Sequence, residues 1–433
     1  MRHILLYTLL ILGLQLIQCC SPDDYTYYNN ENVDISTIDS VVLKPNQKTL
    51  IADGYARLDL RPVIFNKQGY RIPDSRVKEE WLEYTTSEGV ALTRHFSTSD
   101  PSLVGKTITT QVKIKGTNVE SQSFSFLVVA PLDPKYTTEI TIPVIFHVIQ
   151  TTEDIESYGG NYSREKIELQ LEKFNNLFSG ISSVKPVGVN THIHFQMAQY
   201  DQYGQKMLTP GINRLTVPEL NADIIANGFA DFLVAQHLVW PTEKYMNIWL
   251  ISDRKGLVSG FAKEVSDTCF PHYLYPGTPE SGRLEGIEWT EFSGNPDFLP
   301  KESGVIYKLQ ELDAIVRKFS DNSGNFSANN ELAYYVGRYF GLLPTCTFDK
   351  RETGTDYCDD TMDYWGRDID NFNNTWYKTI DECYLRSENI MDDPTGLHVS
   401  VSKNQCERIR WVLEHCPERA AWKNDFAFTG IEK

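Results

Sequence analysis

The first third of the chain alternates apolar and polar residues over short stretches. Because successive side chains of a strand point to opposite faces, this pattern predicts half-buried strands rather than helices. Turn-forming residues separate the stretches, as they do in sandwiches of short antiparallel strands. The predicted strands cover residues 49–51, 56–65, 90–96, 108–114 and 121–129. We therefore expect an immunoglobulin-like β-sandwich over residues 39–131.

The pattern of apolar and polar residues changes after residues 131–134, which begin and end with proline and which we take as a linker. Apolar runs at 139–150, 191–200 and 245–251 predict buried strands. Residues 164–178 predict a buried helix, and a weaker pattern predicts another helix over 305–318. Since strands and helices alternate, residues 135–420 are expected to form a mixed α/β domain, and the whole chain belongs to the α+β class.

The N-terminus has the form of an export signal. Arg2 and His3 precede an apolar run over residues 4–17, which is too short to span a membrane as a helix. The run ends in a sequence that resembles a bacterial lipobox, with Cys20 as the predicted lipid-bearing residue and Cys19 as the alternative. Residues 1–20 are thus a predicted lipoprotein signal peptide. The other interpretation is a plain secretory signal that is cleaved without lipid attachment.

The residues after the cysteine pair agree with display outside the cell. Ser-Pro-Asp-Asp at 21–24 resembles the acidic export tag of surface-displayed lipoproteins in the Bacteroidetes. The polar residues 21–38 predict a disordered tether between the lipid and the fold. We therefore expect an exported protein that is anchored by its lipid to the outer membrane at the cell surface.

Composition narrows the classes of partner. The chain has 433 residues, enough for two or three domains, and 41% hydrophobic residues support packed cores. Its formal net charge of -17 disfavours nucleic acid, whose phosphates it would repel, and electrostatic docking on anionic lipid. A peptide or glycoprotein ligand remains compatible with the charge. The oligomeric state does not follow from the sequence.

Six cysteines remain beyond the signal peptide. In an exported protein disulfides are the expected state of such cysteines, and five of the six lie close together near the C-terminus. No pair has the C-x-x-C spacing that is typical of zinc sites. We therefore predict disulfides rather than metal ligation at positions 269, 346, 358, 383, 406 and 416.

One short stretch has the spacing of a zinc-binding helix without its chemistry. In the motif H-E-x-x-H-x-x-G-x-x-H, two histidines four residues apart share a helix face, and the glycine ends the helix so that a third can approach the metal. When the motif is aligned on Gly341, Tyr334, Arg338 and Pro344 occupy the histidine positions and Tyr335 the glutamate position. An ordinary amphipathic helix over 331–343 is the alternative.

The residues at these four positions cannot replace three zinc ligands and a general base. Tyr335 has a phenol whose reference pKa is about 10, so it is a poor general base at neutral pH. Arg338 carries a permanent positive charge and no free lone pair for a metal. Pro344 has no side-chain donor. We therefore predict no catalytic residue and no zinc ligand at these degenerate positions.

Further segments, in chain order, extend this similarity. They are residues 142–149, 194–198, 210–214, 245–250, 259–262, 355–361, 389–392 and 405–413. Together they resemble the pappalysin-like metzincins, and most nearly the zinc-dependent metalloproteinase lipoproteins of gut Bacteroidetes. The resemblance implies a zincin-like fold in the second domain, a zinc cofactor, and Met391 as the methionine of the Met-turn beneath the metal. Asp393 departs from the family, where a tyrosine is usual.

The resemblance also raises questions about ions. The Arg338 guanidinium is predicted to stand in the place of zinc and to pair with Asp392 or Asp393, because a buried unpaired charge is costly. Asp359 and Asp360 could bind calcium, as some family members do, or could be a solvated acidic loop.

The histidines offer little for a metal. His192 and His194 lie two apart in a predicted strand, which makes them a possible metal pair, although partly exposed strand residues are favoured because no third ligand has a nearby spacing. His147 is expected to be a core histidine whose hydrogen bonds are satisfied.

Three functions remain open. The first is a surface lipoprotein with an inactive, metallopeptidase-like domain that binds a peptide or glycoprotein in the former cleft. The second is an active zinc-dependent metalloendopeptidase with unrecognised ligands. The third is a structural or adhesive lipoprotein that acts through its immunoglobulin-like domain.

Overall fold

The computed structural model describes seventeen stretches of the chain, with Cys19, Cys20 and the predicted signal peptide outside them. They are residues 33–45, 47–158, 160–181, 188–220, 229–252, 270–278, 284–294, 303–309, 312, 317–321, 324–328, 331–347, 355–362, 364–365, 377–380, 383–392 and 396–432. Among these residues, none of the helices has the length and apolar character needed to cross a membrane.

The chain divides into two compact units. The first comprises the described residues up to Leu43 together with Pro62–Ala91 and Thr110–Phe124, and the second comprises Lys44–Arg61, Leu92–Thr109 and the described residues from Ser125 onward. The predicted boundaries at 39–131 and 135–420 stay predictions, and so does the immunoglobulin-like sandwich.

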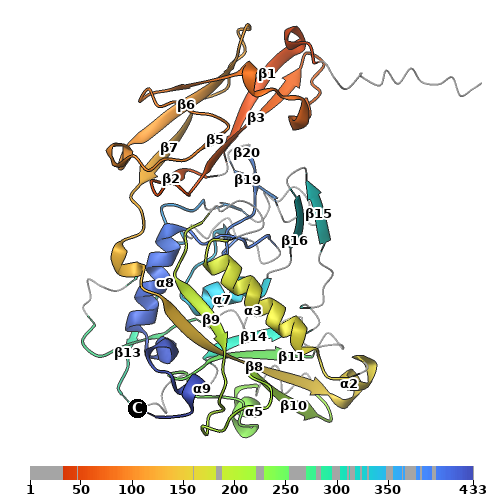
Figure 1. Ribbon diagram of the computed structural model, residues 1–433, viewed down its shortest axis with the longest axis vertical. Coiled ribbons are helices and arrows are strands. Elements are labelled where there is room, and N and C mark those ends of the chain that lie inside the picture. Colours follow the sequence, from red (N-terminus) through yellow and green to blue (C-terminus); the bar gives the residue numbers. More distant parts are fainter. Residues whose placement is uncertain are drawn as a thin grey trace, which may run out of the picture. The chain divides into compact units, whose positions relative to one another are not determined.

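In the described residues before the predicted linker there are seven strands, most of them labelled in Figure 1. They are β1 (Ile38–Pro45), β2 (Thr49–Ile51), β3 (Leu58–Asn66), β4 (Leu82–Thr86), β5 (His95–Phe96), β6 (Thr107–Ile114) and β7 (Phe124–Val129). Hydrogen bonds join them in two sheets of order β1-β3-β5 and β2-β7-β6-β4. In β6, Ile108, Val112 and Ile114 are buried while their neighbours are not, as the alternating pattern predicted. A 3-10 turn at Ile35–Thr37 lies inside the range predicted as a tether, so these residues are structured.

A parallel sheet forms the centre of the remaining chain. Its strands are β8 (Ile140–Thr151), β9 (Ile193–Met197), β10 (Ile212–Val217), β11 (Met246–Ile251) and β14 (Gly304–Lys308). The order is β10-β8-β11-β14, and β9 pairs with the first half of β8. β8 and β11 are buried along almost their whole length, which explains their continuous apolar sequences.

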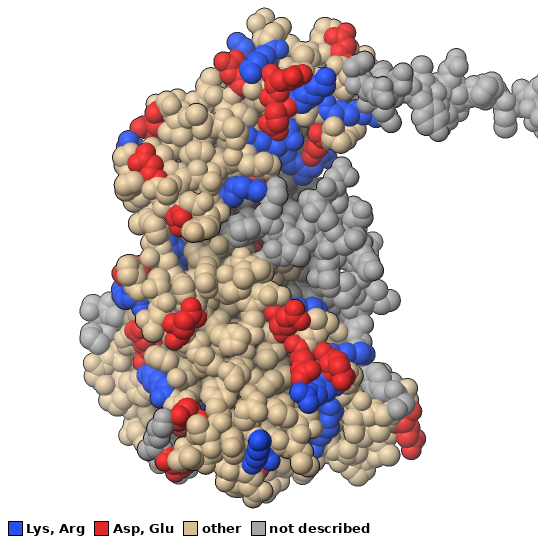
Figure 2. All heavy atoms as spheres, viewed as in Figure 1, with Lys and Arg blue, Asp and Glu red and all other residues tan. Residues whose placement is uncertain are grey.

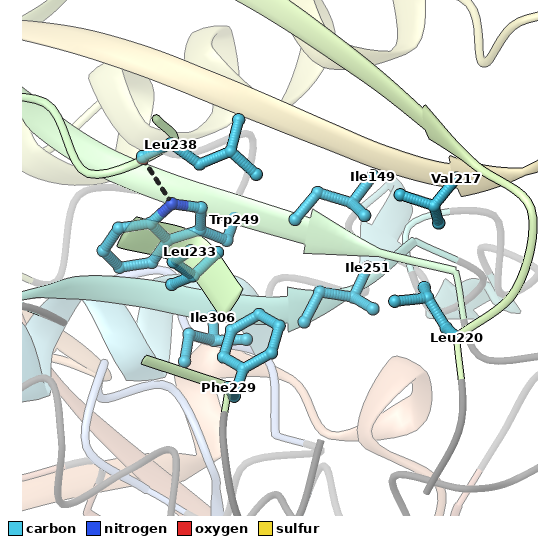
Figure 3. Close-up of a cluster of buried hydrophobic side chains, with 9 residues drawn as sticks. All are labelled: Ile149, Val217, Leu220, Phe229, Leu233, Leu238, Trp249, Ile251 and Ile306. Carbon is cyan, nitrogen blue, oxygen red and sulfur yellow. Dashed lines mark hydrogen bonds between the residues drawn. The ribbon is translucent and has the colours of Figure 1, made fainter. Parts of the chain in front are cut away.

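The register of the sheet assigns side chains to its two faces. Registered residues of parallel strands share a face, so Asn213, His147, Trp249 and Ile306 form one row and Arg214, Val148, Leu250 and Tyr307 form a row on the opposite face. On the first face α5 (Phe229–Ala235) packs through Phe229 and Leu233 against Ile149 and Trp249 (Figure 3). The indole nitrogen of Trp249 there donates to the carbonyl of Leu238 at 2.9 Å.

Two helices cover the opposite face (Figure 1). They are α3 (Arg164–Phe178) and α7 (Glu331–Tyr339). Phe340, just after α7, contacts the rings of Phe178 and Phe195 at centroid distances of 5.9 and 6.1 Å, and Tyr335 of α7 contacts Tyr307 of β14 at 5.9 Å. The prediction of a helix over 164–178 is confirmed.

The predicted helix over 305–318 is wrong. Residues Gly304–Lys308 form strand β14, which pairs in parallel with β11, and Arg317–Asp321 form strand β15. Val305 and Ile306 are branched at Cβ and are buried, on opposite faces of the sheet. Such residues favour a buried strand, and the pairing with β11 decides the outcome.

The C-terminal part of the chain is helical. α8 (Lys403–His415) begins with a capping box, in which the Ser402 hydroxyl accepts from the backbone of Gln405 and the Gln405 side chain accepts from the backbone of Ser402. A 3-10 segment (Pro417–Lys423) and α9 (Phe426–Thr429) follow. The remaining elements are short: α2 (Thr152–Tyr158), β12 (Tyr273–Leu274), β13 (Thr290–Glu291), β16 (Gly324–Ala328), β17 (Cys346–Thr347), β18 (Tyr364–Trp365), β19 (Tyr377–Ile380) and β20 (Cys383–Arg386).

The disulfide prediction is wrong for two of the cysteines. Cys406 and Cys416 are buried thiols without a disulfide bond. The Cys416 sulfur donates instead to the carboxylate of Glu418 at 3.7 Å, and burial raises the pKa of Cys406 to about 12. Cys269 lies outside the described residues, and Cys346 and Cys358 are buried.

Candidate functional site

Helix α7 carries the degenerate metal-site positions, and it ends where the sequence predicted. Gly341 has φ +79, and the backbone nitrogens of Gly341 and Leu342 donate to the carbonyls of Arg338 and Gly337. This Schellman arrangement closes the helix and needs the left-handed conformation that glycine adopts without strain. Pro344 follows the turn in a half-buried position.

Tyr334 and Tyr335 are part of a cluster of aromatic rings. Both are buried, and their rings meet edge to face at 5.4 Å. Tyr335 faces Tyr307 of the sheet, and the ring of Tyr334 lies 6.2 Å from that of His398. The two phenols therefore pack in a core-like aromatic environment.

His398 is a residue of this site that the sequence analysis missed. It is fully buried and has φ +46, a conformation that is costly for a residue with a side chain. It lies 64 positions from Tyr334 in the chain, so no local pattern pointed to the contact.

The Arg338 guanidinium is fixed inside the protein. The residue is only 8% exposed, and its guanidinium lies 4.4 Å from the centre of the Phe270 ring. Its Nη1 donates to the carbonyl of Leu342 at 3.2 Å, and Nε of Arg408 donates to the carbonyl of Gly341 at 2.7 Å. Two cations thus bind the negative end of α7, which is a favourable place for positive charge.

The predicted pairing of Arg338 with the Met-turn aspartates stays a prediction. Asp392 is fully buried, and its carboxylate accepts from the Thr345 hydroxyl at 2.7 Å and from the backbone of Asn389 at 3.0 Å. These bonds hold the turn that contains Met391. Asp393 lies outside the described residues.

Met391 packs directly against the helix. A Cβ atom added to Gly337 would lie 2.6 Å from the sulfur of Met391, far inside van der Waals contact. The turn is also tied to the segment after α7, because the backbone nitrogen of Thr345 donates to the carbonyl of Met391 at 3.0 Å. The absent side chain at position 337 is what allows this close approach.

We expect Gly337→Ala to destabilise the protein by about 1 to 2 kcal/mol, because the clash with Met391 outweighs the better helix propensity of alanine. Urea unfolding followed by circular dichroism measures the change. In a Met391→Ala background the sign should reverse, since the obstructing sulfur is gone. A stabilising effect of Gly337→Ala in the otherwise unchanged protein would show that Met391 does not press on the helix.

The donors at the degenerate positions do not fit a zinc ion. A neutral phenol, a guanidinium and a proline replace three imidazoles, and a fixed cation beside the site repels a dication. Within the described stretches, no group of three or more histidine, cysteine or acidic side chains is placed to hold a metal.

In the acidic loop that contains Asp359 and Asp360, Asp360 has a structural role. The Asp360 carboxylate accepts from the Ser402 hydroxyl at 2.6 Å and from the backbone nitrogen of Asn404 at 2.9 Å. Both donors belong to the N-terminus of α8, so Asp360 caps that helix. Burial raises its pKa despite these bonds. Asp359 lies at an exposed position of the same loop.

His147 is a satisfied core histidine, as predicted. It is fully buried, and its Nε2 and Nδ1 bond to the side chains of Asn247 at 3.0 Å and Asn213 at 3.1 Å. Asn247 also accepts from the backbone of Trp240 and donates to its carbonyl, which fixes its oxygen toward His147. His147 is therefore neutral with its proton on Nε2, and burial lowers its pKa to about 4.

The other histidine pair does not form a metal site. His192 has φ +56 and lies before β9 rather than in it, so it does not share a strand face with His194. Its Nδ1 bonds to the Glu139 carboxylate at 2.8 Å, and His194 is exposed on β9.

Comparison with known proteins gives a limited result. No family model and no curated protein matches the chain. Mature mirolysin from Tannerella forsythia, in complex with a cleaved peptide, is similar over 67% of this chain and 97% of its own, with 19% identity and a TM-score of 0.41. A promirolysin mutant from the same organism is similar over 67% and 86%, with 17% identity and a TM-score of 0.41. At these values the likeness assigns neither a family nor an activity to this chain.

Proposed function

We propose that this protein is an exported surface lipoprotein whose domain over 135–420 keeps a metzincin-type frame without metallopeptidase activity. It acts by binding a peptide or glycoprotein in the former cleft. The ordered series of family-like segments supports the frame, and the signal-like N-terminus ending at Cys20 or Cys19 supports export and an outer-membrane anchor.

One observation carries the proposal of inactivity. The residue at the second histidine position, Arg338, is buried and held by Phe270 and by the Leu342 carbonyl. A permanent cation fixed there is incompatible with a bound dication nearby, because the two charges would repel each other in a poorly solvated place. The apolar frame of the helix is kept: Leu332, Val336, Phe340 and Leu342 are all buried.

The surface is compatible with a protein ligand rather than nucleic acid. On the face drawn in Figure 2, acidic side chains lie among the basic ones. The net charge of -17 disfavours nucleic acid, because its phosphates would be repelled.

Zinc stoichiometry tests the proposal. The purified protein without its signal peptide is incubated with zinc, desalted and analysed for metal, and we expect no tightly held zinc. As a matched control, Tyr334→His, Tyr335→Glu, Arg338→His and Pro344→His are combined in one variant, which should gain about one zinc per chain because it restores the donor set of the motif.

Two results would contradict the proposal. Near one zinc per chain in the unsubstituted protein would indicate an active metallopeptidase with unrecognised ligands. A restored variant that folds, as judged by circular dichroism, but still takes up no zinc would show that α7 is not a former metal helix.

A further inference from the structure

A second polar site lies on the sheet face that α3 and α7 cover. Gln150 of β8 and Arg214 of β10 point to this face, two positions apart in the register, since Arg214 pairs with Val148 and Thr216 with Gln150. Tyr307, which contacts α7, is three strands away in the same row as Arg214. At the usual spacing of strands this separates the two sites by about 14 Å.

The two side chains hold the same residue. Gln150 Oε1 accepts from the backbone nitrogen of Tyr162 at 3.1 Å, and Arg214 Nη2 donates to the carbonyl of Tyr162 at 2.8 Å. Tyr162 lies in the connection between α2 and α3. Because both side chains reach the backbone of one residue, the carboxamide and the guanidinium are near neighbours.

Each of the two side chains also has a donor nitrogen that lacks an acceptor. Within the described part of the chain, Gln150 Nε2 and Arg214 Nη1 are buried nitrogens without a hydrogen-bond partner. Gln150 is only 2% exposed, so solvent does not reach it freely. A buried N–H group without a hydrogen bond costs free energy, and a bound oxygen acceptor would remove this cost at both nitrogens.

We infer that Gln150 and Arg214 form a carboxylate-binding site that is distinct from the α7 site. A carboxylate presents two coplanar oxygens, which match one N–H of a guanidinium and one N–H of a neighbouring amide. The Lys166 ammonium, 5.1 Å from the centre of the Tyr162 ring, adds a second positive charge to the neighbourhood. Arg214 is half-buried, so part of its side chain lies at the surface.

This inference does not depend on the proposed loss of zinc. It concerns donors on β8 and β10, whereas the zinc experiment concerns α7. A negative result in the zinc experiment therefore does not contradict the carboxylate site, and a negative result in the acetate experiment does not contradict the proposed loss of zinc.

Binding of acetate tests the site. The thermal unfolding midpoint of the full chain without its signal peptide is measured in sodium acetate and in sodium chloride at equal ionic strength. We expect a saturable rise in acetate only. A capped dipeptide with a free C-terminal carboxylate is compared with its C-terminal amide: tighter binding of the acid peptide than of acetate identifies a peptide as the source of the carboxylate, and equal binding identifies a small organic acid.

Variants separate a binding site from a purely structural contact. Arg214→Lys keeps the charge but loses the planar fork and should weaken acetate binding at least about tenfold. Gln150→Glu replaces the donor by a negative charge and should abolish binding. Arg164→Gln removes an exposed arginine that pairs with Glu168, near the same helix, and should leave binding unchanged.

The inference is overturned if acetate and chloride give the same midpoint in the unsubstituted protein. In that case Gln150 and Arg214 only fasten the α2–α3 connection, and their substitution lowers stability equally in both salts. Because this readout uses the unsubstituted protein, it stays decisive even where a variant does not fold.

Discussion

Acidification from pH 7 to pH 4 should destabilise the protein by about 3 kcal/mol through His147 alone. The reason is that the unfolded chain binds a proton at an ordinary histidine pKa near 6.5, while the folded protein resists protonation down to about 4. Between these values the unfolded state holds more protons, so stability falls as the pH falls. Above pH 6.5 the contribution is fully present, and below pH 4 no further loss comes from this residue.

The physical origin is the closed environment of the imidazole. His147 lies between Trp240 and Trp249, with ring centroids at 5.3 and 6.1 Å, and Asn213 and Asn247 use both nitrogens. A proton on Nδ1 would face the amide donor of Asn213 and would place a charge in an apolar core. Both effects oppose protonation.

The variant His147→Gln separates the contribution of His147 to the pH dependence of stability from that of the other groups that titrate in acid. Glutamine can keep the donor toward Asn247 but cannot titrate, and we expect it to be less stable than the unsubstituted protein at pH 7 because the ring contacts are lost. Urea unfolding is measured for both proteins from pH 7 to pH 4. Their difference in unfolding free energy should shrink by about 3 kcal/mol over that range. A difference that does not change with pH would mean that His147 takes up its proton over the same pH range in the folded and the unfolded protein.

The pattern of apolar residues predicted some elements at their observed bounds. The strand at 49–51 and the helix at 164–178 coincide with β2 and α3, because their apolar residues mark the positions that become buried. The strand β10, Ile212–Val217, was not predicted. Only its end residues are buried, and its conformation depends on pairing with β8, which is far away in the chain.

The site was predictable only where a motif spacing existed. The spacing on Gly341 located α7 and its end, and Met391 was found against the same helix at Gly337. In contrast, the contacts of Arg408 with the Gly341 carbonyl and of His398 with Tyr334 join residues more than sixty positions apart. The left-handed conformation of His192 likewise has no signal in the sequence, and it removes the basis of the proposed histidine pair.

Arg419 connects the C-terminal segment to the end of α7, and Arg419→Met should cost about 3 to 5 kcal/mol of unfolding free energy. The residue is 2% exposed, and its Nε donates to the carbonyl of Tyr339 at 2.6 Å while Nη1 donates to the Ser303 hydroxyl at 2.7 Å. The guanidinium also lies 3.6 Å from the centre of the Tyr339 ring. Methionine fills a similar volume but leaves these acceptors and the fully buried Glu418 carboxylate without their cation.

Glu418 provides the internal control for this prediction. Its carboxylate lies 3.5 Å from Arg419, and burial raises its pKa even though Arg419 opposes the shift. If the cost of Arg419→Met arises from an uncompensated buried charge, Glu418→Gln in the same chain should recover a large part of it, because a neutral amide needs no counter-ion. Chemical unfolding of the two single variants and the double variant completes the cycle. Equal losses in Arg419→Met and in the double variant would place the cost in the hydrogen bonds to Tyr339 and Ser303 rather than in the charge pair.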